Sequence, residues 1–164
     1  MDRSKRVDEC VNSITRIQQS LWQSGDLEFL ERADAEQETE IPVYWGMSPS
    51  SPPPPFWLNE LTLVRIERNL SVTTLTWGVR MAFCPFLVHN YDNEAIKRAA
   101  VTAENISLAF DANVYLDGWA SWTTLDSSSN LITIDERKQI NQFIVRLHFG
   151  LRFGIQMQRP VPYC

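Results

Sequence analysis

The chain contains few residues of the types that carry out catalysis. Its only histidines are His89 and His148. His89 and Asp92 could form a metal-ligand pair, but they stand at an expected strand-to-helix junction, where Asp92 serves better as the helix cap. Cys84 precedes a proline inside an apolar run, which is typical of a small buried hydrophobic residue rather than a nucleophile. These residues therefore predict no acid–base or thiol chemistry.

Three further aspartates and a serine run could act in a loop-built site. Asp111, Asp117 and Asp126 flank expected loops, where turn formation explains them as well as cation binding does. Ser127–Ser129 lacks the framing glycines of a nucleophile elbow. The six glycines are scattered and form no phosphate-binding loop. The sequence predicts a protein that is not an enzyme, with no catalytic residues, cofactor or metal.

One row of polar residues has two interpretations. Arg146, His148 and Arg152 recur on one side of an alternating run, with Gly150 and Gly154 leaving room beside them. The row could contact nucleic-acid phosphates. It could also line a protein–protein joint or face solvent, and the acidic character of the whole chain favours this second interpretation.

The run that carries this row predicts an unusually long strand. Large apolar residues occupy seven successive odd positions, and strict alternation is typical of a strand with one buried face. Thirteen residues span about 43 Å, about twice the usual strand. A strand of this length extends beyond one small core, so it predicts a partner, such as another subunit. The seven residues are Phe143, Val145, Leu147, Phe149, Leu151, Phe153 and Ile155.

Length and composition fit one ordinary domain with an uneven charge distribution. The chain has 164 residues, 44% hydrophobic and 21% charged, with a net charge of -5. Residues 26–40 carry seven acids and only Arg32, a local charge of -6. After Glu136 there are five bases and no acid. This polarity favours attraction between subunits.

Cysteine use and hydropathy predict a soluble protein made in the cytoplasm. Cys10, Cys84 and Cys164 are odd in number and widely spaced, so they form neither a zinc pattern nor a disulfide framework. No run reaches the roughly 18 apolar residues that a membrane helix needs. No signal-peptide core is present near the N-terminus.

Periodicity predicts two helices and several strands. Helices are expected over 5–22 and 93–111, the second with the apolar stripe Ile96, Ala99, Ala100, Ala103, Ile106 and Phe110. A hairpin joins 61–68 to 73–83 through Asn69-Leu70-Ser71. Its first strand is expected to place Thr62, Val64 and Ile66 on one face. Shorter strands are expected at 41–46, 119–125 and 130–134. The predicted class is α+β, a mostly antiparallel twisted sheet with two helices on one face.

Two segments are predicted to lie outside these elements of the single domain 1–164. Residues 26–60 are expected to form an acidic and proline-rich extended loop insertion, with Pro49–Pro55 as a polyproline-type connector. Trp57 is expected to anchor this connector at a surface between subunits. Residues 157–164 are expected to form an extended C-terminal tail that contains Tyr163.

The order of these elements resembles bacteriophage tail terminator and tail completion proteins. The residues that carry the resemblance are Leu61–Phe83 for the hairpin, Asn93–Phe110 for the alanine-rich helix and Gln142–Gln156 for the long strand. The resemblance implies a structural virion protein of the neck, assembled in the host cytoplasm. It also implies a ring, commonly a hexamer, that closes the tail tube and binds the head connector.

The resemblance implies particular partners. They are other copies of the chain, the tail tube or sheath, and the connector; DNA could pass through the ring without sequence-specific binding. An alternative is a small α+β domain that binds a ligand or peptide, or another tail or baseplate component. The residues expected at subunit or partner interfaces are Trp57, Arg146, His148, Arg152 and Tyr163.

Overall fold

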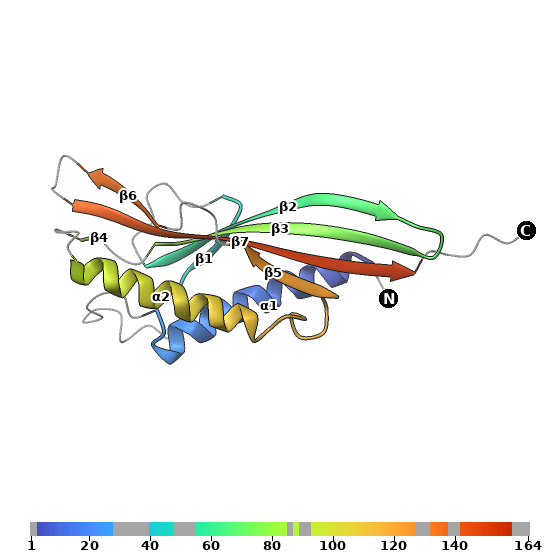
Figure 1. The fold of residues 1–164 in the computed structure, drawn as a ribbon, viewed down its shortest axis with the longest axis horizontal. Coiled ribbons are helices and arrows are strands. Elements are labelled where there is room, and N and C mark those ends of the chain that lie inside the picture. The colour runs from blue at the N-terminus through green and yellow to red at the C-terminus, as the bar shows by residue number, and fades with distance from the viewer. Residues whose placement is uncertain are drawn as a thin grey trace, which may run out of the picture.

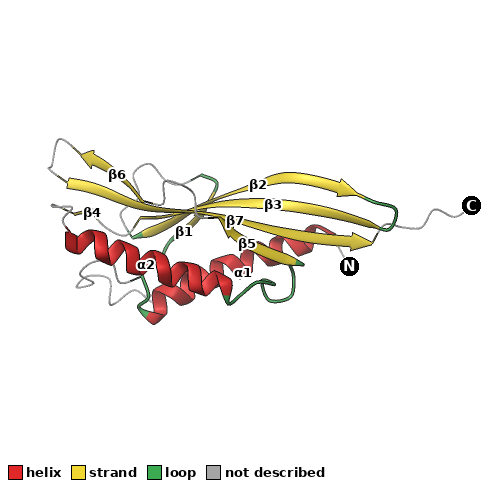
Figure 2. Cartoon of the chain, viewed as in Figure 1, coloured by secondary structure: helices red, strands yellow, loops and turns green. Residues whose placement is uncertain are grey.

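A computed structural model gives an α+β fold, as the sequence predicts. In the part of the chain that it describes, two helices lie on one face of a mostly antiparallel sheet (Figures 1 and 2). The acidic residues 28–39, most of Pro49–Pro55, and Tyr163 lie outside the described residues. The described residues are 3–27, 40–47, 55–84, 87–88, 93–126, 132–137 and 142–158.

Helix α1 spans Arg3–Ser24, which confirms the helix predicted over 5–22. It ends where Gly25 takes a left-handed φ of 86° and donates its N–H to the Trp22 carbonyl at 3.3 Å. The helix buries one apolar stripe against the sheet: Cys10, Ile14, Ile17, Leu21 and Trp22.

Helix α2, Asn93–Asp111, confirms the second predicted helix but buries a narrower stripe than expected. Ala100 is exposed and Ile96 is 42% exposed. Ala100 is rotated by about 100° from Ala99 around the helix axis, so it cannot share a narrow buried stripe with it. The buried residues are Ala99, Thr102, Ala103, Ile106 and Phe110.

Strand β7, Gln142–Gln158, lies at the centre of the sheet (Figure 1). On one side it pairs with β3, Val72–Cys84, and with the short β4, Leu87–Val88. On the other side it pairs with β5, Trp122–Asp126, and β6, Ile132–Arg137. All four pairings are antiparallel.

The sheet continues from β3 to β2, Phe56–Arg68, and ends at β1, Val43–Trp45, which runs parallel to β2. Strands β2 and β3 form the predicted hairpin, and Asn69 accepts the N–H groups of Ser71 and Val72 within its turn. The far ends of β2, β3 and β7 reach past both helices (Figure 1).

The long strand predicted at the C-terminal end is confirmed, and it extends to Gln158. Its described odd positions from Leu147 to Ile155 are buried, whereas Arg152 is exposed. The side chains of Phe143 and Val145 lie outside the description. The tail predicted over 157–164 is wrong at its first two residues, since Met157 and Gln158 belong to β7 and pair with β3.

A β-bulge in β2 makes the prediction wrong for the outer half of the strand, where side chains lie on the opposite face from the one predicted. The register between β2 and β3 shifts between Leu63 and Arg65. An extra residue in one strand inverts the alternation beyond it. Ile66 therefore lies opposite Leu75 on the helix-covered face, and it does not share a face with Thr62 as predicted. The period-2 pattern alone cannot show where such an insertion falls.

The predicted loop insertion over 26–60 is wrong at both of its described ends. Asp26 and Leu27 close the turn after α1, and Leu27 is buried. Residues Phe56–Glu60 belong to β2 and pair with β3. The reason is that Phe56 and Trp57 bury large apolar rings, which outweighs the tendency of the preceding prolines to extend the connector.

Polar side chains of α1 form hydrogen bonds with the edge of the sheet at three points. Gln18 and Asn59, both fully buried, exchange two amide hydrogen bonds of 2.9 and 2.8 Å. Gln19 forms two bonds with the backbone of Ile41, at 2.7 and 2.9 Å. Trp45 donates its indole N–H to Thr15 at 3.0 Å. These contacts set the position of α1 along β1 and β2.

Replacing Gln18 with leucine is expected to lower the free energy of unfolding by about 1–2 kcal/mol, because Asn59 then keeps a buried amide without its partner. Asn59→Leu should cost a similar amount. The double variant should cost less than the sum of the two, since it leaves no buried amide unpaired. Urea denaturation measures all three variants; strict additivity would contradict the role of the pair.

Candidate interaction surface

The face of the sheet opposite the two helices is open among the described residues (Figure 2). The buried odd positions of β7 face the helices, so its even positions lie on the open face. Arg146, His148 and Arg152 therefore share this face, as the alternation predicts. Arg80 of β3 joins them, and the sequence analysis did not include it in the row.

Large and small residues alternate across neighbouring strands of this face. Arg152 lies opposite Gly78, His148 lies opposite Ala82, and Arg80 lies opposite Gly150. A hollow of about 880 Å³ on this face is lined by residues of β2, β3 and β7, with Asp126 of β5 and Thr133 of β6. The open face therefore carries a shallow groove lined by both basic and acidic side chains.

The charges of the groove are partly compensated within the chain. Arg152 Nε lies 3.6 Å from the Asp126 carboxylate, and both side chains are about half exposed. Glu60 lies directly opposite Arg80 across β2 and β3. His148 Nε2 and Thr133 Oγ1 form a 2.7 Å hydrogen bond. Arg146 Nε is buried and has no hydrogen-bond partner among the described residues. A lining that carries both charges is better suited to binding another protein than to binding a continuous row of phosphates.

The room predicted beside Gly154 does not exist. A Cβ at Gly154 would lie 2.2 Å from the indole nitrogen of Trp122, because that ring lies across the glycine. Gly78 is similarly covered by Val64, whose Cγ2 would lie 2.9 Å from an added Cβ. Gly150 meets only ordinary contacts, with Asp126 Cβ at 3.6 Å. Only Gly150 of the two predicted glycines leaves space on this face.

Trp57 is not the surface anchor that the sequence predicts. It is 0% exposed and lies opposite Phe83, with ring centroids 5.0 Å apart. Its place in β2 directs the indole into the core beneath the helices. Nothing can be said of Tyr163, the other aromatic residue predicted at an interface, because it lies outside the described residues.

Two groups of apolar side chains are exposed in different parts of the molecule. We call the first the hairpin patch; it comprises Leu63 and Ile66, on the helix side of the far end of β2, and Leu70 in its turn. We call the second the helix patch; it lies on α2 and the turn after it and comprises Val101, Leu108, Val114 and Tyr115. Clustered exposed apolar groups are typical of interaction sites.

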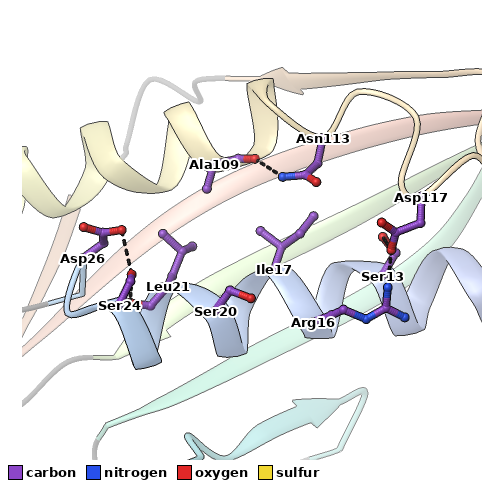
Figure 3. A pocket seen from close by; sticks show the side chains of 10 residues that line it. All are labelled: Ser13, Arg16, Ile17, Ser20, Leu21, Ser24, Asp26, Ala109, Asn113 and Asp117. Carbon is purple, nitrogen blue, oxygen red and sulfur yellow. Dashed lines mark hydrogen bonds and ion pairs between the residues drawn. The ribbon is translucent and has the colours of Figure 1, made fainter.

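A smaller cavity of about 320 Å³ lies between α1 and the turn after α2 (Figure 3). In this turn, Leu116, Asp117 and Gly118 have left-handed φ angles of 46°, 60° and 87°. Asp117 accepts a hydrogen bond from Ser13 Oγ at 2.9 Å and pairs with Arg16. These contacts indicate that Asp117 stabilises the strained turn. The strand that was expected to begin at Trp119 begins after this turn, at Trp122.

The remaining candidates for chemistry do not form a site in the described residues. Cys10 and Cys84 are buried, and burial raises the pKa of the Cys10 thiol to about 12, so it stays protonated near neutral pH. No group of three His, Cys, Asp or Glu side chains in this part of the chain could hold a metal ion. His89, Asp92 and Ser127–Ser129 lie outside the described residues.

The fold and the surface define the class of this protein. It is an α+β protein with helices on one sheet face and a mixed-charge groove on the other. Comparison with known protein families and with curated proteins finds no match. Neither described helix is long and apolar enough to cross a membrane.

Proposed function

We propose that this chain is a structural subunit that assembles into a ring and serves in the neck of a bacteriophage as a tail terminator. The ring would close the tail tube and connect it to the head connector. The proposal rests on the resemblance carried by the hairpin, the alanine-rich helix and the final long strand. It gives no catalytic role to any residue.

The observation that carries the proposal is the separation of the two apolar patches. The hairpin patch lies on β2 and its turn, whereas the helix patch lies on α2 and the following turn. If the hairpin patch of one copy contacts the helix patch of the next, the contact is head-to-tail. Head-to-tail contacts of identical subunits produce rings when the rotation closes.

The mass of the purified chain in solution tests this proposal. We expect a closed oligomer in native mass spectrometry at micromolar concentration. Ile66→Ser should shift it towards monomers, because the hairpin patch loses apolar area. Glu40→Gln, an exposed change outside both patches, should leave the oligomer unchanged. A wild-type chain that stays monomeric alone and with purified tail tubes would contradict the proposal.

The place in the virion requires a separate measurement. An antibody against the chain should label the head–tail junction of purified virions in electron microscopy. Label on the tail tip instead would support a baseplate component.

A second candidate is a domain that binds a small ligand or peptide, and the hollow of about 880 Å³ favours it. Such a domain would remain monomeric or dimeric, and a ligand would raise its melting temperature. Arg80→Ala, at the wall of the hollow, should remove that stabilisation. Mass in solution therefore separates the two candidates directly.

A further inference from the structure

The outer halves of β2 and β3 have an uncovered apolar surface on the helix side of the sheet. The odd positions of β3 from Val79 to Phe83 are buried, but Leu75 and Trp77 on the same face are only partly buried. On β2, Leu63 lies opposite Trp77 and Ile66 lies opposite Leu75, and these two residues are 41% and 50% exposed. We call these four residues, two from each strand, the hairpin shelf.

Helix α1 borders the hairpin shelf because it crosses the sheet diagonally (Figure 1). Near its start, Arg6 donates from Nη1 to the Gln156 carbonyl of β7 at 2.7 Å. Farther along, Thr15 accepts the indole N–H of Trp45 of β1 at 3.0 Å. The diagonal leaves the outer corner of β2 and β3 uncovered. Helices pack about 8–10 Å apart, so a further helix can lie on this corner beside α1.

Helix α2 has a matching stripe on the side that faces away from its own sheet. Val101 and Leu108 are separated by seven residues, so they lie on one side of the helix, and both are more than half exposed. Glu104 lies between them on this side and is also exposed. Lys97 and Asp111 stand at the two ends of the stripe. The stripe therefore has an acidic residue between two exposed apolar residues.

The hairpin shelf and this stripe carry opposite charges. Arg68 continues the shelf towards the turn, since it lies opposite Thr73 on the helix side of β3. Arg65, on the other face of β2, is already paired with Glu67 at 2.7 Å. Among the described residues, neither Arg68 nor Glu104 takes part in an ion pair. A basic residue beside one apolar surface and an acidic residue within the other make the two surfaces complementary.

We infer that α2 of one copy lies on the hairpin shelf of the next copy as a third helix beside α1, with Glu104 paired to Arg68. This inference rests on the proposed ring and specifies the contact between its subunits. Val101 and Leu108 then cover the exposed apolar side chains of the shelf, and both surfaces lose apolar area to water. The charge pair fixes the position of the helix along the shelf.

Exchanging the two charges tests this contact. Arg68→Glu and Glu104→Arg should each raise the concentration at which the ring half-dissociates by about tenfold or more, because like charges then face each other across the joint. The double variant should assemble like the wild type in native mass spectrometry over a dilution series. Arg65→Ala, on the other face of β2, is the control and should change nothing. A double variant that assembles no better than the single variants would contradict the pairing.

A cysteine pair gives a second test that depends on proximity rather than on charge. Ile66 and Leu108 are 50% and 59% exposed, so their replacement leaves the core intact. Ile66→Cys combined with Leu108→Cys should give a ladder of covalent oligomers under oxidation. Neither single variant should do so, because in a head-to-tail contact no residue meets its own copy. Crosslinking of Leu108→Cys alone would show that two α2 helices pair with each other, against the inference.

The outcomes separate this inference from the proposed function. A wild-type ring that is insensitive to the single charge reversals, and that gives no crosslink with the cysteine pair, would overturn the contact on the hairpin shelf and leave the ring intact. A wild-type chain that forms no ring, alone or with purified tail tubes, would overturn the proposed function together with this contact.

Discussion

Replacing Phe149 with aspartate is expected to abolish soluble expression of the chain. Phe149 is 4% exposed on β7, opposite Met81, within the core between sheet and helices. A carboxylate there has no described cation to pair with, and burying it costs several kcal/mol. Total stability of a domain is about 5–15 kcal/mol. The soluble fraction after expression and the thermal melt of any recovered protein measure the effect.

The matched control lies on the same strand but on the opposite face. Arg152→Ala removes a half-exposed side chain and its 3.6 Å contact with Asp126, which is worth about 0–1 kcal/mol. This variant should express and melt like the wild type. Equal damage from both substitutions would show that the alternation of β7 does not separate the core from the open face.

The second large effect is expected at Gly154, where valine should lower the free energy of unfolding by about 3 kcal/mol, the upper part of the range for overpacking. A Cβ at this position would lie 2.2 Å from the Trp122 indole nitrogen, so the ring must move off the sheet. Equilibrium urea denaturation measures the loss. Trp122→Ala in the same chain should recover part of it, because the obstructing ring is then absent.

Gly150 provides the control for this prediction. It lies on the same face of β7, and its added Cβ would meet Asp126 Cβ at 3.6 Å, an ordinary contact. Gly150→Val should therefore cost much less than Gly154→Val. Similar losses at the two glycines would indicate that the cost comes from the strand backbone rather than from Trp122.

The sequence by itself determined the elements whose signals are local. The stripe of α1 follows from 3.6-residue spacing, and the long β7 follows from strict alternation between Leu147 and Ile155. The hairpin turn at Asn69-Leu70-Ser71 follows from turn-forming residues. These patterns repeat over a few residues, so they can be recognised without knowledge of the rest of the chain. The α+β class follows from their order.

The candidate surface was predictable only in part. Alternation placed Arg146, His148 and Arg152 on one face of the strand, and in the structure His148 and Arg152 line the hollow on that face. It did not indicate Arg80, which comes from another strand and joins the groove through the pairing of β3 with β7. Nor did it indicate that the Trp122 ring covers Gly154. Which residues become neighbours across a sheet depends on strand order and register.

Only the tertiary structure decided where several residues with ambiguous signals lie. Trp57 follows a run of prolines and was expected at a surface, yet it lies in the core because β2 pairs with β3 from Phe56 onwards. The bulge after Leu63 moves Ile66 to the other face. The Gln18–Asn59 pair joins residues 41 positions apart. The physical reason is common to all three, because long-range packing and pairing energies outweigh the small local preferences that a sequence pattern reveals.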